Sequence, residues 1–119
     1  MRARAERGAV TAELVMAIPL LVAVTAALVW LLSVGLAQVR MIDAARETAR
    51  ALARGDDPAD ALALGRQVAP AGAVFTVTES DGLVTVRATG PAGGPGPGLA
   101  LVPEVELSAR AVALLEDDP

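Results

Sequence analysis

Residues 14–39 read LVMAIPLLVAVTAALVWLLSVGLAQV, a stretch of twenty-six residues without a charged side chain. As a helix this stretch would be about 39 Å long at ~1.5 Å per residue, whereas the hydrocarbon core of a bilayer is about 30 Å thick. It can therefore span a membrane with a tilt, or with its ends among the headgroups. The stretch predicts a transmembrane helix.

Basic residues precede this stretch. Arg2, Arg4 and Arg7 stand there against one acid, Glu6, although the whole chain has a net charge of −4. By the positive-inside rule, these arginines place the N-terminus in the cytoplasm. We expect a single-pass protein of the cytoplasmic (inner) membrane with an acidic extracytoplasmic part. Nucleic acid is not expected as a partner, because neutralising phosphates requires a basic surface.

Several residue types that carry chemistry are absent. The chain has no Cys, no His and no Lys, so the usual thiolate ligand, general base and Schiff-base amine are missing. It also lacks the G-x-S-x-G, phosphate-loop and H-E-x-x-H motifs. We expect no enzyme, no metal site, no cofactor and no small-molecule substrate.

Glu13 lies at the entrance of the apolar stretch, five residues after Gly8. Ionisable groups near the membrane interior are costly and mark functional sites. Glu13 can simply reach the headgroups beside a helix N-terminus, which favours a negative charge. Alternatively, a cut between Gly8 and Ala9 would create an ammonium that pairs with Glu13 of a neighbouring subunit and sets their register.

Pro19 interrupts the helical hydrogen bonds near the start of the span, at a cost of ~3 kcal/mol in water, and predicts a kink. A cleaved secretory signal is the rival interpretation, since Gly35-Leu36-Ala37 presents small residues before Gln38. Two features oppose it: the apolar run exceeds the usual ~7–15 residues, and Glu13 brings a charge to its start. The helical pattern also continues from Gln38 to Arg54.

Two segments carry a family resemblance. Residues 7–13, RGAVTAE, followed by an apolar helix, resemble the class III signal of type IV pilins. More narrowly, RGAVTAELVMAIPLLV at 7–22 and IDAARETARALARG at 42–55 resemble the TadE-like minor pilins of tight-adherence (Tad/Flp) pilus systems. The six-residue spacing from Glu13 to Pro19 follows the TadE pattern. The resemblance covers Arg7 to about Gly55.

This resemblance implies a role and partners. A prepilin peptidase would recognise Gly8 and cut before Ala9 on the cytoplasmic side. Glu13 and Pro19 would serve assembly and register, with other pilin subunits and the pilus assembly machinery as partners. The C-terminal part is larger than in the major Flp pilins, which favours a minor pilin or pseudopilin, located in the inner membrane and then in an adhesive surface pilus.

The resulting organisation has three parts: a cytoplasmic leader at 1–8, a transmembrane and stalk helix at 9–55, and a small extracytoplasmic α+β domain at 56–119. In the stalk, four alanines together with one leucine supply a surface of mostly small residues that suits close packing: Ala44, Ala45, Ala49, Leu52 and Ala53. Arg46, Arg50 and Arg54 recur every fourth residue, with Asp43 and Glu47 placed to pair with them. This charged surface is either a contact for neighbouring subunits or a solvated salt-bridge face.

Cap residues delimit two helices. Gly55 is expected as the C′ residue that ends the stalk helix. Asp57-Pro58 is expected as the N-cap and first residue of a short helix that reaches about Val68 before Pro70. Its apolar members are Leu62, Leu64 and Val68.

Alternating residues predict a small antiparallel sheet of about three strands. Ala73–Glu79 and Leu83–Thr89 flank Asp81-Gly82, a strong hairpin signal. A two-residue turn opposes Phe75 to Ala88, Val77 to Val86 and Glu79 to Val84, with one apolar face. A three-residue loop would mix the faces.

Three C-terminal segments complete the expected α+β fold. Gly90–Gly98 is predicted to be a flexible connection. Val105–Ala111 is predicted to be the third strand, and Glu116–Pro119 a frayed acidic tail. The main interpretation is a TadE-like minor pilin that begins at Ala9. The alternatives are an uncleaved membrane anchor that begins at Met1 and a secreted protein that begins at Gln38.

Overall fold

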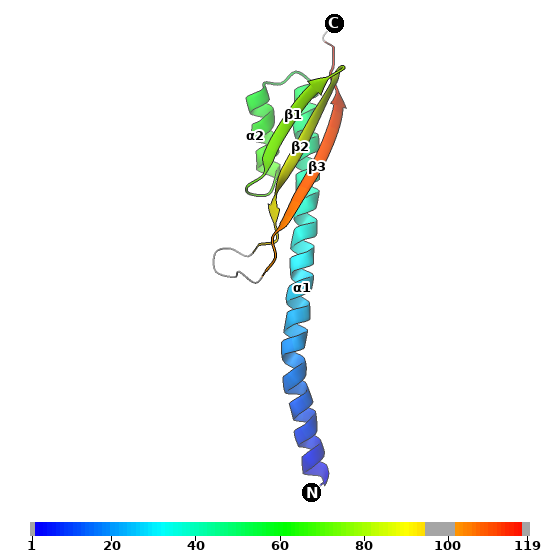
Figure 1. Cartoon of the computed structure of the whole chain (residues 1–119), viewed down its shortest axis with the longest axis vertical. Helices are drawn as coiled ribbons and strands as arrows, with labels where there is room; N and C mark the ends of the chain where they lie inside the picture. The colour runs from blue at the N-terminus through cyan, green and yellow to red at the C-terminus, as the bar shows by residue number, and fades with distance from the viewer. Residues whose placement is uncertain (1, 95–101, 118–119) are drawn as a thin grey trace. The chain divides into compact units, whose positions relative to one another are not determined.

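The computed structural model describes residues 2–94 and 102–117. Its elements are two helices and three strands: α1 Arg2–Ala53, α2 Pro58–Val68, β1 Val74–Ser80, β2 Leu83–Ala92 and β3 Val105–Leu114 (Figure 1). The chain divides into two compact units, Met1–Leu32 and Ser33–Pro119. The expected α+β class, with a long N-terminal helix, a short helix and a three-stranded sheet, is confirmed.

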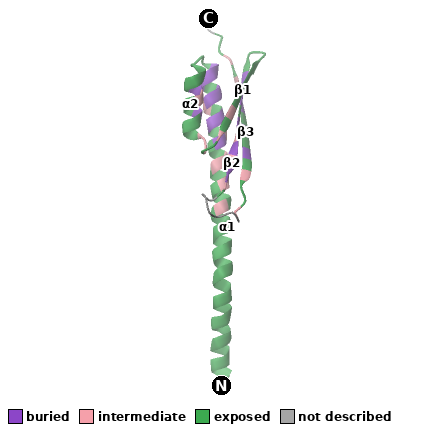
Figure 2. Ribbon diagram, turned by 60° about the vertical axis from the view of Figure 1, so that its left-hand side comes forward, coloured by how far each residue is buried: buried purple, intermediate pink, exposed green. Residues whose placement is uncertain are grey.

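The first unit is a stretch of helix whose apolar side chains have no cover. Its large apolar residues are mostly more than half exposed, for example Met16 at 79% and Leu32 at 74%, and Figure 2 shows this part of α1 in green. The hydroxyls of Thr11 and Thr25 donate to carbonyls four residues back at 2.8 Å, which satisfies them within the helix. By length and composition α1 can cross a membrane, and it fits a single-pass membrane protein.

The predicted end of the first helix is confirmed. Gly55 has a φ of 88°, which glycine adopts without steric cost. Its amide donates to the Leu52 carbonyl at 3.0 Å, and the Asp56 amide donates to the Ala51 carbonyl at 3.1 Å. These two bonds form a Schellman motif, which satisfies carbonyls that the helix end would otherwise leave unpaired.

The start of α2 is also as predicted. The Asp57 side chain accepts a hydrogen bond from the Ala59 amide at 2.9 Å, and Pro58 is the first helical residue. This geometry is that of an N-cap followed by a proline whose missing donor costs nothing at this position.

The predicted hairpin register is correct at every pair. Phe75 lies opposite Ala88, Val77 opposite Val86 and Glu79 opposite Val84. Asp81 and Gly82 have φ angles of 53° and 74°, the positive values that a type I′ turn requires. The sheet order is β1-β2-β3, with both pairs antiparallel.

The flexible connection was predicted to begin at Gly90, but β2 extends past this residue. Gly90, Pro91 and Ala92 belong to β2 and pair with residues of β3, while residues 95–98 lie outside the described part of the chain. Proline is tolerated here because the last partner of β2 on β1 is Val74, opposite Thr89, so β2 has a free edge at Pro91.

The core of the second unit lies between the inner face of the sheet and the last turns of α1. Its apolar residues include Met41, Val84 and Val86, all 0% exposed. The residues of the predicted close-packing surface of the stalk are buried here as well: Ala44, Ala45, Ala49, Leu52 and Ala53. They pack inside their own chain and are therefore not available to a neighbouring subunit.

The predicted ion pairs of the stalk do not form. Within residues 2–94 and 102–117, the salt bridge is Arg54 to Asp56, at 3.1 Å between exposed groups. Asp43 and Glu47 do not reach the arginines that follow them. Exposed pairs of this kind contribute at most about 1 kcal/mol, so the Arg54–Asp56 pair adds little to the stability of the fold.

Small residues bring α2 onto the core. Ala61 and Gly65 are buried, whereas Leu64 and Val68 are each 38% exposed. A Cβ at Gly65 would overlap Thr48 Oγ1 and lie 3.2 Å from the Phe75 ring. The helix thus packs against the core through its smallest residues. Leu64 and Val68, which were predicted as apolar members of α2, lie at the edge of this contact.

The chain is anchored up to Glu116, the first residue of the predicted frayed tail. The Leu115 amide donates to the Gly82 carbonyl at 2.9 Å, and the Glu116 amide donates to the Ala53 carbonyl at 3.0 Å. The second bond gives the last carbonyl of α1 a partner. Residues 118–119 lie outside the described part.

Candidate functional site

The predicted cleavage site lies in the first turns of α1. Gly8 and Ala9 are both helical and exposed, and nothing lies within 4 Å of the place where a Gly8 Cβ would be. A protease binds its substrate as an extended strand, so cleavage here would require these turns to unwind. Glycine helps, because it weakens a helix by about 1 kcal/mol relative to alanine.

Glu13 is exposed among apolar neighbours. It lines a shallow surface depression together with Ala12, Met16, Ala17 and Leu20. Its carboxylate is therefore the polar group of an otherwise apolar surface. In lipid or in a packed bundle such a group needs a cationic partner or a hydrogen-bond donor.

Helical geometry places Ala9 and Glu13 on one face. They are four residues apart, so their Cβ atoms lie about 5–6 Å from each other on successive turns. An amino group created at Ala9 would sit beside Glu13 on the same surface of the helix. The proposed cleavage and the proposed charge pair thus concern one contiguous surface.

Pro19 lies elsewhere on α1. Six residues at about 100° each put it roughly 120° around the axis from Glu13. The helix continues through Pro19, which lacks the amide that would donate to the Val15 carbonyl. The structure therefore brings Ala9 and Glu13 together but not Glu13 and Pro19.

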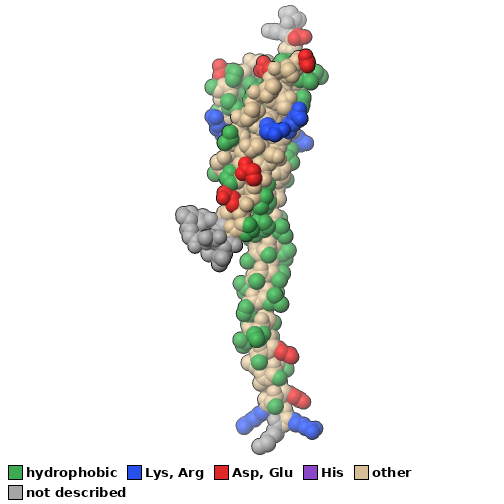
Figure 3. All heavy atoms as spheres, in the orientation of Figure 1, with side chains coloured by type: hydrophobic (Ala, Val, Ile, Leu, Met, Phe, Trp, Pro, Cys, Tyr) green, Lys and Arg blue, Asp and Glu red, His purple; other side chains and the backbone are tan. Residues whose placement is uncertain are grey.

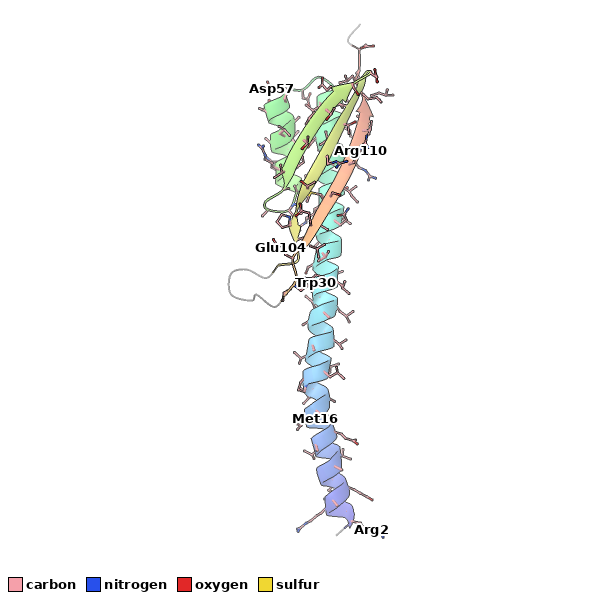
Figure 4. All side chains as sticks on the ribbon, in the orientation of Figure 1. Arg2, Met16, Trp30, Asp57, Glu104 and Arg110 are labelled. Carbon is pink, nitrogen blue, oxygen red and sulfur yellow. The ribbon has the colours of Figure 1, made fainter. Side chains whose placement is uncertain are left out.

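The predicted leader is charged and belongs to the first turns of α1. Arg2, Arg4 and Arg7 are exposed, as is Glu6. Figure 3 shows blue side chains at the N-terminal end, and Figure 4 labels Arg2 there and Met16 in the apolar part. The charged and apolar segments follow each other without an intervening loop.

One group of residues was not anticipated. Arg87 on β2 lies directly opposite Arg110 on β3, on the outer face of the sheet. The hairpin register sets Arg87 opposite Thr76 on the outer face, but no turn signal sets the register of the third strand. Alternation along β3 places Arg110 on the outer face, but it does not show which residue of β2 lies beside it.

Comparison with known proteins identifies the N-terminal region. Residues 8–50 match the family model described as TadE-like protein. The match begins at Gly8 and includes Ala9, Glu13 and Pro19, so the resemblance is confirmed over these residues. No curated protein and no solved structure matches the chain.

Proposed function

Since residues 8–50 are TadE-like, we propose that this protein is a minor pilin or pseudopilin of a tight-adherence (Tad) pilus system. A prepilin peptidase cuts it between Gly8 and Ala9 on the cytoplasmic side of the inner membrane. The protein then takes part in pilus assembly, and it has no catalytic role of its own.

One observation carries this proposal. The family match begins at Gly8, and the charged residues before it lie in the first turns of the same helix, outside the matched range. The arginines of these turns fit a leader that stays in the cytoplasm, since positive charge is retained on that side. The apolar helix follows at once, as a substrate processed at the membrane surface requires.

The uncovered helix suggests how assembly proceeds. In the membrane, lipid covers the apolar side chains between Leu14 and Leu32, which the chain itself leaves exposed. In a pilus, the helices of neighbouring subunits replace the lipid. The ammonium of Ala9 on one subunit then meets Glu13 of the next. This contact favours one register, because a shifted neighbour would set apolar side chains against the charges of Ala9 and Glu13.

The second unit argues against release by an ordinary signal peptidase. Val34 and Ala37 pack against the core, and the Gln38 side chain donates to the Ser108 carbonyl at 3.1 Å. A cut after Ala37 would remove the first two contacts and leave Gln38 at a frayed end. We therefore favour processing at Gly8.

The mature N-terminus tests the proposal. The protein is isolated from membranes and sheared pili of its own cells, with and without an active prepilin peptidase, and its intact mass is measured. We expect a chain that begins at Ala9 when the peptidase is active and at Met1 when it is not. A chain that begins at Met1 in both strains, or at Gln38, would refute the proposal.

A further inference from the structure

The outer face of the sheet carries two arginines side by side. Arg87 and Arg110 are register partners across β2 and β3, and Thr76 on β1 completes their row. Both arginines are exposed. Figure 3 shows blue side chains over the strands, and Figure 4 labels Arg110 on β3. Like charges placed directly opposite each other destabilise a sheet, so this pair lowers the stability of the isolated fold.

No acid of the sheet compensates this pair. The neighbouring rows on the outer face contain only hydroxyl and apolar side chains: Val74, Thr89 and Ser108 on one side, and Thr78, Thr85 and Val112 on the other. Along β3 the next acid on this face is Glu106, four residues from Arg110 and so about 13 Å away. Among the described residues, neither arginine forms a salt bridge within 4 Å.

The arginines border a shallow hollow. It has a volume of about 550 Å³, and its lining consists of hydroxyl and guanidinium side chains: Thr76, Thr78, Ser80, Thr85, Arg87 and Arg110. Such a set presents many hydrogen-bond donors, and two guanidinium groups can hold a carboxylate through paired bonds. The volume suits a side chain or a short segment rather than a large cofactor.

Apolar side chains extend the same face toward the hairpin turn. Val112 is 51% exposed and Leu114 is 74% exposed, and both lie on the outer side of β3. Uncovered apolar residues beside arginines are typical of protein–protein contacts, in which arginine often supplies much of the binding energy. A protein partner could contact both the arginines and the apolar side chains of this surface.

We propose that this outer face is a docking surface for another protein, which presents at least one carboxylate to Arg87 and Arg110 and an apolar side chain to Val112 and Leu114. A second copy docked face to face is excluded, because it would set four arginines against each other. An extended polyanion is disfavoured, since residues 33–119 carry seven arginines against twelve acids. The pilus context of the partner rests on the proposed function, whereas the surface itself does not.

Photo-crosslinking of the full chain in its own cells tests the proposal. Benzoylphenylalanine replaces Thr78 in the hollow, and the crosslinked peptide is identified by mass spectrometry. The double variant R87E/R110E is compared with the matched control R46E/R66E, which reverses two exposed arginines away from the outer face. Equal amounts of each variant in the membrane fraction show that folding is retained.

We expect a crosslink to a protein segment that contains Asp or Glu. R87E/R110E should lower its yield at least tenfold, and the control should change it less than twofold. Replacing the identified acid by arginine should restore the crosslink in R87E/R110E. A crosslink only to glycan, a segment without an acid, equal loss in the control, or no crosslink overturns the proposal. None of these outcomes depends on the mature N-terminus, so this proposal and the proposed function fail separately.

Discussion

The close packing of α2 at Gly65 predicts that Gly65→Ala destabilises the protein. In an exposed helix this change stabilises a protein by about 1 kcal/mol, because alanine restricts the unfolded chain and favours helix. Here the new methyl would overlap Thr48 Oγ1 and press on the Phe75 ring at 3.2 Å. Overpacking of this kind costs roughly 1–3 kcal/mol. We expect a net loss of about 1 kcal/mol in the free energy of unfolding of the second unit.

Hydrogen exchange can measure this loss in the full chain in detergent. The amides of Val84 and Val86 lie in the central strand, so their exchange reports opening of the sheet. A loss of about 1 kcal/mol corresponds to roughly fivefold faster exchange, since 1.4 kcal/mol is tenfold. Ala63→Gly, at an exposed position of α2, serves as the control for helix propensity and should also speed exchange by about fivefold.

A second substitution separates the steric cause from propensity. Thr48→Ala removes the hydroxyl, which bonds only within its own helix, to the Ala44 carbonyl at 2.8 Å. In that background, Gly65→Ala should become neutral or stabilising, a coupling of about 1 kcal/mol or more between the two sites. If Gly65→Ala alone slows exchange, or if the two changes are additive, the close approach of α2 to α1 is not what limits this position.

Three further changes test the N-terminal proposal and the helix cap. Gly8→Ala strengthens the helix that must unwind by about 1 kcal/mol; we expect at least fivefold slower processing in a pulse-chase experiment, and an unchanged rate would contradict the unwinding step. Glu13→Val should leave membrane insertion equal or better while pilus incorporation, measured in sheared pili, falls strongly, because an unpaired buried ammonium costs about 3–5 kcal/mol; full incorporation would show that the carboxylate is incidental. Asp57→Ala removes the bond to the Ala59 amide and should lower the free energy of unfolding by about 1 kcal/mol, read from exchange of the same strand amides; no change would mean that water replaces the cap.

Local chemistry made much of the fold predictable. Asp81-Gly82 favours one turn type, and the alternation of apolar residues on either side allows one register, so the hairpin could be written pair by pair. Gly55 and Asp57-Pro58 likewise signal a helix end and a helix start through their own conformational preferences. Each of these signals lies within a few residues of the structure that it specifies.

Contacts between distant segments were not predictable in the same way. The alanines at 44, 45 and 49 indicate a face that packs closely, but the same pattern suits a neighbouring subunit or the chain's own sheet. The sheet covers them in the structure. No turn chemistry sets the register of β3 against β2, so the sequence does not predict the arginine pair. At Gly90 the reason for glycine is also distant, since a Cβ there would lie 3.1 Å from the Ala73 Cα.

The positions of Ala9 and Glu13 relative to each other were predictable, because both lie on one helix. Gly8, Ala9 and Glu13 are close in sequence, so helical periodicity suffices to place Ala9 and Glu13 on one face. The same periodicity shows that Pro19 lies apart from them.

The burial of α1 residues 41–53 under the sheet determines what a soluble fragment of this protein must contain. A fragment that starts after Gly55 would keep all three strands but lose Met41 and the alanines that cover Val84 and Val86. Its sheet would present an open apolar face and aggregate. A fragment that starts at Ser33 retains the core and the bond from Gln38 to the Ser108 carbonyl, and it leaves out most of the apolar span. For expression and crystallisation, the useful boundary therefore lies inside the first helix and not at its end.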